Sequence, residues 1–331
     1  MKILIVGLGS MGKRRIRLIR QIDNTVMLLG VDSKKERRAE TEKLFGIETL
    51  EDLSDAFEKE CECAFICTSP LSHADLIEDC LKHNMHVFTE INLVTKKYDS
   101  NMQLAKERKL VLFLSSTFLY RSEIRYIQSE VRNSKSVLSY VYHVGQYLPD
   151  WHPWEKYTDY FIGDARTNGC REIMAIDFPW IYKTFGKIVS FHVKKEKKTN
   201  LKINYNDSFM MLLEHENGVQ GMVMIDVVSR KAVRNLEIFG EDLYITWDGT
   251  EKGLKKLDIS SKKENTVLLY DTVDKQDGYA DFINEDEYRN EIISFFEEIS
   301  GKKKSEYGFK EDKYILNLID MIESGSANKG L

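Results

Sequence analysis

The feature that most constrains the fold stands at the start of the chain, where the apolar run KILIV leads directly into GLGSMG. The following segment, KRRIRLIRQI, places apolar residues at helical spacing. Gly7, Gly9 and Gly12 thus form a G-x-G-x-x-G motif between an expected strand and an expected helix. The first glycine permits a tight turn, the second lets backbone amides approach a pyrophosphate, and the third lets helix and strand pack closely. We predict a dinucleotide at this turn, with Ser10 and Met11 among its contacts.

Four further apolar runs follow over the first third of the chain, separated by segments of helical character: VMLLGVD, CAFICTSP, HVFTE and LVLFLSSTF. These runs lack the apolar–polar alternation of half-exposed strands. Runs of this kind are typical of a parallel sheet that is covered on both faces. The pattern predicts a doubly wound α/β domain over residues 1–118.

Asp32 ends the second of these strands, about twenty residues after the glycines, where a carboxylate can accept hydrogen bonds from ribose hydroxyls. The same charge opposes a 2′-phosphate, so Asp32 favours NAD over NADP. Lys34, Lys35 and Arg37 follow closely, and they leave NADP as the alternative cofactor.

Beyond residue 118 the pattern changes to segments in which apolar and polar residues alternate. These segments are SVLSYVYHVGQY, DSFMMLLEHENGVQGMVMIDVV, RNLEIFGEDLYITWD and NTVLLYDTV. Turn sequences at residues 217–218 and 240–242 predict hairpins, and therefore a large, mostly antiparallel sheet with one open face. Helical segments at about 170–185, 286–299 and 310–324 complete an α+β domain over residues 119–331.

Large apolar residues occupy outward positions of this expected sheet, namely Met210, Met222 and Met224. One face of such a sheet packs on helices, and an apolar outer face favours a second copy of the chain. We therefore predict that the second domain binds the substrate and forms a homodimer or homotetramer through its sheet.

Composition excludes several other classes of protein. The net charge is −5 over 331 residues and the basic clusters are short, so we expect no nucleic-acid partner. No apolar run reaches the roughly 18 residues that a membrane helix needs, and the chain begins on a strand pattern rather than a signal peptide. We expect a cytoplasmic protein with reduced thiols and no metal; a zinc site at Cys61, Cys63 and Cys67 is the alternative.

In the order of its segments the chain resembles the Gfo/Idh/MocA oxidoreductases, which include glucose–fructose oxidoreductase and inositol dehydrogenase. The matching segments cover essentially the whole chain: VGLGSMGKRR, CTSPLSHAD, HVFTE, YRSEIRYI, LLEHENGVQG, IFGEDLYITWDG and LNLIDMIESGSANKG. The resemblance implies a Rossmann domain followed by a sheet domain, a nicotinamide cofactor, and a sugar, cyclitol or nucleotide sugar as substrate.

Two further strand ends complete the expected cofactor site. Thr68, Ser69 and Pro70 end the third apolar run, and His73 follows near the cofactor edge in a positioning role. Glu90 ends the fourth run and matches the glutamate of the family's Glu-Lys-Pro motif. We predict that Glu90 positions the cofactor or the substrate.

The chain departs from the family at both positions that usually handle a proton. Ile91 replaces the lysine of the Glu-Lys-Pro motif, and Asn92 replaces its proline. On the family's cofactor-facing helix, the histidine position falls on Ile176, and the aspartate positions fall on Ile173 and Pro179. Oxidation of an alcohol needs a group that takes the hydroxyl proton as the hydride leaves. A base must therefore lie elsewhere, or the reaction does not take place.

Charged residues beside the vacated helix positions are candidates for the missing group. Glu172 precedes Ile176 by four residues and shares its helical face, so we predict Glu172 as the base. Arg171 would fix the substrate, and Asp177 would contact it, because charges in an apolar helix are costly to bury without a purpose. The alternative is that Arg171 pairs with one acid while the other is exposed.

The segment HVGQYLPDWHPWEKYTDYF combines flat aromatic rings with hydrogen-bonding groups, which suits a sugar ring or a base. Tyr147, Asp150 and Trp151 are the predicted substrate contacts. His152 is the rival base, because an imidazole acts near neutral pH without a large pKa shift. The alternative is a loop that packs on the sheet or on a neighbouring subunit.

Two functions follow from these residues. The first is an NAD(P)-dependent oxidoreductase with an atypical proton-transfer residue. The second is a catalytically inactive protein that senses a dinucleotide or a sugar, which the double loss at Ile91 and Ile176 favours.

Overall fold

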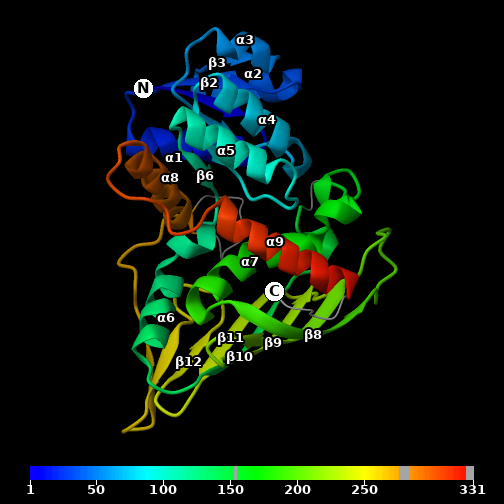
Figure 1. Ribbon diagram of the computed structural model, residues 1–331, viewed down its shortest axis with the longest axis vertical. Helices are drawn as coiled ribbons and strands as arrows, with labels where there is room; N and C mark the ends of the chain where they lie inside the picture. The colour runs from blue at the N-terminus through cyan, green and yellow to red at the C-terminus, as the bar shows by residue number, and fades with distance from the viewer. Residues whose placement is uncertain (153–154, 276–283, 326–331) are drawn as a thin grey trace. The chain divides into compact units, whose positions relative to one another are not determined.

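The computed structural model describes residues 1–152, 155–275 and 284–325 (Figure 1). By internal contacts the chain divides into two compact units, Met1–Thr117 with Tyr288–Lys313, and Phe118–Glu287 with Tyr314–Leu331. The division expected from the sequence, at residue 118, assigns residues 288–313 to the second domain. In the structure these residues pack within the first unit.

The first unit is built on a six-stranded parallel sheet in the order β3-β2-β1-β4-β5-β6. Its strands are β1 (Lys2–Val6), β2 (Met27–Val31), β3 (Glu48–Leu50), β4 (Cys63–Ile66), β5 (His86–Thr89) and β6 (Leu112–Leu114). The helices between them are α1 (Ser10–Ile22), α2 (Lys35–Phe45), α3 (Leu53–Phe57), α4 (Pro70–Lys82) and α5 (Tyr98–Arg108).

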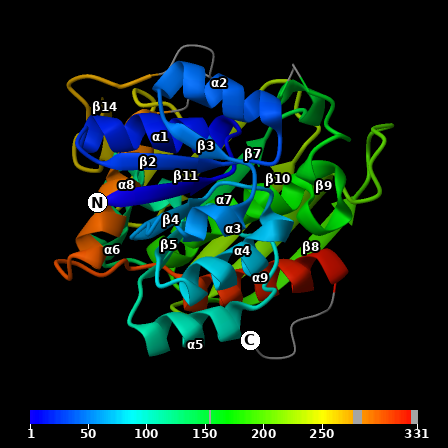
Figure 2. The ribbon, with the colours of Figure 1, turned by 90° about the horizontal axis from the view of Figure 1, so that it is seen from above.

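Figure 2 shows α1 and α2 on one side of these strands and α4 and α5 on the other. This arrangement follows from right-handed crossovers around a parallel sheet, and the predicted Rossmann fold is confirmed. The elements β3 and α3 are not predictable from the sequence pattern, because elements of three and five residues are too short to show a period.

The helix α8 (Glu285–Ile299) explains why residues 288–313 pack in the first unit. Phe65, Phe88 and Phe113 lie in register on β4, β5 and β6. The Phe295 ring makes edge contacts with all three, at centroid distances of 5.3 to 5.6 Å. These contacts bury apolar rings that the strands alone would leave exposed.

The second unit is built on an eight-stranded sheet in the order β14-β13-β12-β11-β7-β10-β9-β8. All pairs are antiparallel except β7 with β10, so the predicted mostly antiparallel sheet is confirmed. The strands are β7 (Ser139–Gly145), β8 (Ile188–Glu196), β9 (Ser208–His215), β10 (Gln220–Asp226), β11 (Val233–Phe239), β12 (Tyr244–Trp247), β13 (Lys255–Asp258) and β14 (Lys263–Thr266).

The strand expected at NTVLLYDTV is largely wrong. Only Asn265 and Thr266 of this segment belong to β14, and Leu268 is the most exposed large apolar side chain of the described residues, at 76%. The segment therefore has the apolar composition of a strand but is not buried in a sheet. The strand β8 forms the edge of the sheet beside β9.

Helices cover one face of this sheet. Tyr140 of β7 stacks on Phe185 with a centroid distance of 4.3 Å, and Tyr142 makes an edge contact with Trp180 at 5.2 Å. Phe185 and Trp180 belong to α7, so this helix packs across the buried face. Besides α8, the helices that follow β6 in the chain are α6 (Ser122–Asn133), α7 (Gly169–Phe185) and α9 (Phe309–Ser324). Short 3-10 turns lie between β6 and α7, namely η1 (Thr117–Tyr120), η2 (Leu148–Asp150), η3 (Phe161–Gly163) and η4 (Ala165–Thr167).

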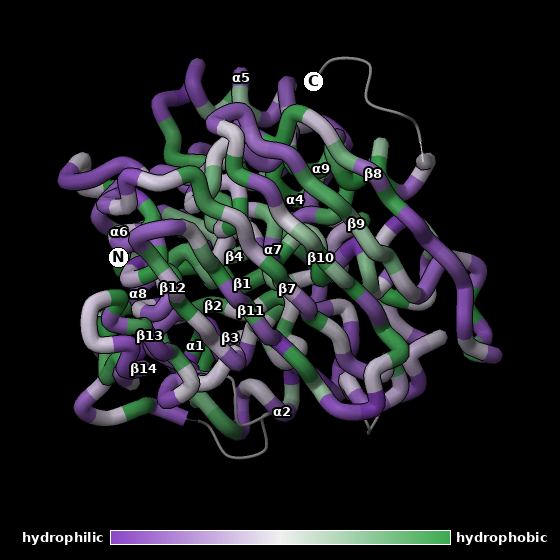
Figure 3. Tube along the Cα trace, turned by 90° about the horizontal axis from the view of Figure 1, so that it is seen from below, coloured by the Kyte–Doolittle hydropathy of each residue, from purple (hydrophilic) through white to green (hydrophobic). Residues whose placement is uncertain are grey.

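The opposite face of the sheet carries apolar side chains, and Figure 3 shows hydrophobic and hydrophilic residues alternating along its strands. Leu212 and Met222 are paired across β9 and β10 and are each 55% exposed. Met210 is 45% exposed and pairs with Met224. An apolar patch of this kind on a sheet face favours contact with another protein surface.

We predict that this face joins copies of the chain in a homo-oligomer. The double variant Leu212→Glu with Met222→Glu is expected to be a monomer, because four buried carboxylates at a two-fold interface would lack partners. Light scattering at micromolar concentration measures the mass of both forms. Leu44→Glu, an exposed apolar position on α2, is the control and should keep the wild-type mass. A monomeric wild type would contradict the prediction.

Across the described ranges, no helix is both long and apolar enough to cross a membrane. The five cysteines all lie in these ranges, where they are buried free thiols. In the same residues, no three His, Cys, Asp or Glu side chains are grouped so that they could hold a metal ion.

Candidate cofactor and active site

Two glycines of the turn between β1 and α1, Gly7 and Gly12, are required by the fold itself. Gly7 has a φ of +92°, and a side chain there would lie 2.8 Å from the Cys67 carbonyl oxygen. A side chain at Gly12 would collide with the Gly7 carbonyl oxygen. These two positions exclude larger residues whether or not a ligand is bound.

Gly9 is different, because the protein fold leaves room at this position. Its backbone is extended, with φ −74° and ψ −161°, and it forms the N-cap of α1. The atoms nearest to a side chain placed there belong to the flexible Arg37 guanidinium, at 3.7 and 3.8 Å. Gly9 has no side chain with which to cap the helix, and the backbone amides at a helix N-terminus favour an anion. This cradle fits the pyrophosphate of a dinucleotide.

Asp32 lies buried at the end of β2, beside the glycine turn. Its Oδ2 accepts a hydrogen bond from the Leu8 amide at 2.8 Å, and its Oδ1 accepts one from the Lys34 amide at 2.8 Å. The Arg37 guanidinium lies 3.5 Å from Oδ2. A carboxylate oxygen accepts more than one hydrogen bond, so Asp32 is held in place and keeps acceptor capacity for a ribose hydroxyl.

We predict that Asp32→Ser shifts cofactor preference towards NADP. The substitution removes the charge that opposes a 2′-phosphate, and it frees Arg37, whose side chain is 42% exposed, to pair with that phosphate. The ratio of the NADP to the NAD dissociation constant should fall by about tenfold or more, measured by calorimetry with both cofactors. Asp52→Ser removes an exposed acid of the same unit and is the control. An unchanged ratio in Asp32→Ser would refute the prediction.

His73 connects the loops that follow β4 and β5. One ring nitrogen, Nδ1, lies 2.8 Å from Asn92 Oδ1, and the other, Nε2, lies 2.9 Å from the Thr68 carbonyl oxygen. Burial lowers the pKa of this histidine. Ser69 is the N-cap of α4 and Pro70 its first residue. His73 therefore links these two loops. Its positioning role stays a prediction, as does contact of Thr68, Ser69 and Pro70 with the cofactor.

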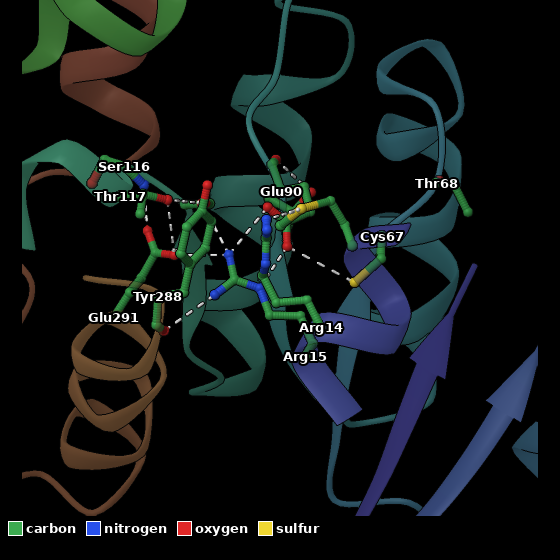
Figure 4. Close-up of polar contacts among 12 residues, drawn as sticks. Arg14, Arg15, Cys67, Thr68, Glu90, Ser116, Thr117, Tyr288 and Glu291 are labelled. Atoms are coloured by element: carbon green, nitrogen blue, oxygen red, sulfur yellow. Dashed lines mark hydrogen bonds and ion pairs between the residues drawn. The ribbon is translucent and has the colours of Figure 1, made fainter. Parts of the chain in front are cut away.

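Glu90 belongs to a buried ion-pair cluster (Figure 4). Arg15 of α1 donates to both of its oxygens, from Nε at 2.6 Å and from Nη2 at 3.1 Å. The same Nη2 donates to Glu291 Oε2 at 2.8 Å, and the Ser116 amide donates to Glu291 Oε1 at 2.6 Å. The Glu90 carboxylate therefore fixes α1 against the end of β5. A direct contact of Glu90 with cofactor or substrate stays a prediction.

The aromatic loop, which is the part of the aromatic segment that follows β7, packs against the start of α7 in the second unit. A side chain at Gly169 would lie 2.9 Å from Leu148 and 3.4 Å from Trp151, so glycine permits this close approach. Trp151 Nε1 donates a hydrogen bond to the Gln146 carbonyl oxygen at 3.0 Å. Trp154 lies outside the described residues. The loop is thus tied to the helix turn that carries Glu172.

Tyr147 and Asp150 lie together at one edge of this loop. The Arg230 guanidinium stacks over the Tyr147 ring, 4.2 Å from its centroid, and lies 3.7 Å from Asp150 Oδ2. The Tyr147 amide donates to the Ser229 carbonyl oxygen at 2.7 Å. The two predicted substrate contacts are therefore brought together, and their binding of a substrate stays a prediction.

Glu172 lies in the first turn of α7 and occupies the face expected for the base. Between residues 169 and 181 of this helix, Glu172 and Ile176 alone are half-buried, and every other residue is buried. Among the described residues no hydrogen bond or ion pair reaches the Glu172 carboxylate. Burial raises its pKa from 4.5 to about 8. A carboxyl group with this pKa changes its charge near neutral pH.

His152, the rival base, contacts Tyr160, and Tyr160 in turn lies near Glu172. Its ring stacks on Tyr160 with a centroid distance of 4.7 Å and an angle of 23°. Its Nδ1 lies 3.7 Å from Glu155 Oε2. Burial lowers the His152 pKa, and the negative charge of Glu172 raises the Tyr160 pKa in addition to burial. The structure thus places His152, Tyr160 and Glu172 in one cluster.

Arg171 points away from this cluster. Its Nη2 lies 2.6 Å from Asp320, and its Nη1 pairs with Glu323. Both acids belong to α9, and the guanidinium is buried. The expected alternative, in which Arg171 pairs with Glu172 or Asp177, is not what the structure shows. The pairing also leaves Arg171 no free edge with which to fix a substrate as predicted.

Asp177 is fully buried and serves the core of the second unit. One of its oxygens, Oδ1, accepts hydrogen bonds from the Tyr142 hydroxyl at 2.6 Å and from Trp180 Nε1 at 2.8 Å. Arg234 pairs with the same oxygen. Asp177 therefore connects α7 to the sheet, and the structure offers no support for its predicted contact with a substrate.

Tyr205 is not among the site residues expected from the sequence, and Tyr160 has no individual role among them. Tyr205 precedes β9, and the charge of Glu172 contributes to the raised pKa of its hydroxyl. Tyr160 stands in an aromatic segment that was already conspicuous, whereas nothing local in the sequence around Tyr205 connects it to α7. The sequence separation between Tyr205 and Glu172 hides their proximity.

Comparison with known proteins agrees with this geometry. Residues 1–116 match the Gfo/Idh/MocA family model, which is described as an oxidoreductase family with an NAD-binding Rossmann fold. The chain is 21% identical to myo-inositol 2-dehydrogenase of Thermotoga maritima over 337 aligned positions, which cover 96% of this chain and 94% of that protein.

Two solved structures share the fold over nearly the full length. An oxidoreductase from Agrobacterium radiobacter in complex with NAD+, L-tartaric acid and magnesium has a TM-score of 0.80 at 13% identity, covering 99% of this chain and 96% of that one. The WlbA dehydrogenase from Bordetella pertussis in complex with NADH and UDP-GlcNAcA has a TM-score of 0.75 at 13% identity, covering 98% and 96%.

Proposed function

We propose that this chain, which belongs to the Gfo/Idh/MocA oxidoreductase family through its residues 1–116, is an NAD-dependent dehydrogenase whose proton-accepting group is Glu172. Its substrate would be a carbinol of a sugar, a cyclitol or a nucleotide sugar. The family membership supports an NAD-binding oxidoreductase, and the site residues support the particular base.

The observation that carries the proposal is the environment of Glu172, which combines partial burial, a carboxylate without a partner among the described residues, and a raised pKa. The group lies on the half-buried face of α7 together with Ile176, the position at which the family pattern expects histidine. In the described chain its carboxylate has no hydrogen-bond or ion-pair partner, and burial raises its pKa to about 8. A structural carboxylate would have a partner, whereas a general base must keep its oxygens available for the substrate.

The residues of the chain divide the work of the reaction between them. When bound, NAD would supply the acceptor for the hydride of the carbinol carbon. The glycine turn and Asp32 hold the dinucleotide, with Gly9 leaving space at the pyrophosphate. The ionised carboxylate of Glu172 takes the proton of the carbinol hydroxyl, and in the reverse direction its protonated form returns the proton to the carbonyl oxygen. His152 is the residue that could replace Glu172 in this role.

The substrate class is supported by the named activities of similar proteins, which include a myo-inositol 2-dehydrogenase and a dehydrogenase bound to UDP-GlcNAcA. A direct test mixes the protein with NAD and a panel of myo-inositol, D-glucose, L-tartrate, UDP-N-acetylglucosamine and UDP-GlcNAcA, and follows absorbance of reduced cofactor. At least one member is expected to reduce NAD.

The rival function is a protein that senses the dinucleotide or the sugar without chemistry. The apolar residues Ile91 and Ile176 at both usual proton-handling positions favour it. Calorimetry separates the two functions, because a sensor would bind NAD and a panel member without producing reduced cofactor.

A further inference from the structure

Two tyrosine hydroxyls near Glu172 are enclosed by protein without being hydrogen-bonded. Among the described residues, neither Tyr160 Oη nor Tyr205 Oη has a hydrogen-bond partner, although both atoms are buried. The Gly169 amide lies towards the Tyr205 hydroxyl and offsets part of the rise in its pKa, but it lies outside hydrogen-bond geometry. Buried hydroxyls almost always have a partner, because an unsatisfied one costs free energy. Two such groups beside one reactive carboxyl point to a ligand.

The two tyrosines reach Glu172 from different segments of the second unit. Tyr160 directly precedes η3, which packs on α7, and Tyr205 lies in the turn before β9. Burial raises the pKa of each hydroxyl, and the charge of Glu172 adds to both shifts. All three groups therefore lie within electrostatic range of one another, and both phenols are neutral at physiological pH.

We infer that Tyr160 and Tyr205 are substrate-positioning residues, which together with Glu172 bind the oxygen of the reacting carbinol and that of a neighbouring hydroxyl. This inference rests on the proposed function. A phenol both donates and accepts a hydrogen bond, so each tyrosine can bind a hydroxyl oxygen while Glu172 takes its proton.

The same cluster selects a substrate that is uncharged at its reacting end. The arginines of the surrounding elements are already paired, Arg171 with Asp320 and Glu323, and Arg234 with Asp177. A carboxylate beside the reacting carbon would therefore meet the charge of Glu172, while the charges of these two arginines are already offset by acids. A neutral sugar is expected to be preferred over the uronic acid that differs from it only in this group.

The variants Tyr160→Phe and Tyr205→Phe test the inference with the panel member that wild type oxidises. Each should raise KM by about 3- to 10-fold, the usual loss for one hydrogen bond, and should change kcat by less than about twofold. Glu172→Gln should show the opposite split. Tyr157→Phe is the matched control, because the Tyr157 hydroxyl accepts a hydrogen bond from the Lys202 amide at 3.0 Å, outside the cluster. D-glucose and D-glucuronate provide the comparison of charge.

The outcomes separate this inference from the proposed function. A rise in KM in both phenylalanine variants, with an unchanged melting temperature and a preference for the neutral sugar, supports the inference. Unchanged KM in both variants, or a preference for the uronic acid, overturns it even if Glu172→Gln abolishes turnover. If no panel member reduces NAD, the proposed function fails and the inference fails with it. If Glu172→Gln is fully active, Glu172 is not the base and the inference fails, although the enzyme function survives with a different base.

Discussion

Replacing Gly9 with valine is expected to weaken NAD binding by on the order of 100-fold, equivalent to about 2.8 kcal/mol, without unfolding the protein. The extended backbone of Gly9 suits any residue, and the side chain would meet only the movable Arg37 guanidinium. The valine methyl groups would instead fill the space through which the pyrophosphate approaches the amides of α1. Calorimetry gives the affinity, and thermal unfolding gives the stability.

Gly12→Val provides the contrasting variant. A side chain at Gly12 collides with the Gly7 carbonyl oxygen even without a ligand, so this variant should lose stability as well as binding. If Gly9→Val binds NAD as tightly as the wild type, the glycine turn does not hold the pyrophosphate in the expected way.

Glu172→Gln is expected to lower turnover by on the order of 10²- to 10⁴-fold, the usual contribution of a general base. Glutamine preserves the size of the side chain but cannot take a proton. NAD affinity should stay unchanged, because the residues predicted to hold the dinucleotide are those of the glycine turn and Asp32, and Glu172 is not among them. If His152→Ala abolishes turnover and Glu172→Gln does not, the base is His152, and the enzyme function survives with a different residue.

The same substitution should leave stability unchanged or raise it at high pH. Burial raises the Glu172 pKa from 4.5 to about 8, so between these values the folded state binds a proton that the unfolded state has lost. Stability therefore falls as pH rises through this window, and the loss is complete above the folded-state pKa. Glutamine carries no charge at any of these pH values, so Glu172→Gln should unfold at a higher temperature than wild type near pH 9. Loss of activity with gain of stability would identify a functional rather than a structural carboxyl group.

Local patterns in the sequence predict most of the fold. The apolar runs of β1, β2, β4, β5 and β6 and the helical periods between them give the Rossmann domain, because burial on both faces leaves a strong signal. The alternation in β7, β9, β10 and β11 gives the open-faced sheet. The segment NTVLLYDTV failed because an apolar run has strand character whether or not a neighbouring strand pairs with it.

The contacts at the sites are harder to predict from the sequence, because they join residues that are far apart in the chain. Glu90 pairs with Arg15, which in turn pairs with Glu291, 276 residues later. Arg171 pairs with Glu323, 152 residues later. The sequence singles out Glu90 and Arg171, but nothing local marks their partners. Arg15 stands in a short basic cluster that suggests an exposed surface, whereas in the structure its side chain is fully buried. Glu172 was selected because the family resemblance puts the histidine position at Ile176, and a spacing of four residues places both on one helical face.

The pH dependence of NAD reduction by wild type and by Glu172→Gln, with the panel member that wild type oxidises, tests the central claim most directly. In wild type kcat/KM should rise about tenfold per pH unit from about pH 6 and level off near the Glu172 pKa of about 8, because oxidation requires the ionised carboxylate. Glu172→Gln should show a low, flat profile over the same range. An identical pH profile and rate in both proteins, or no reduction of NAD by the wild type with any panel member, would contradict the claim.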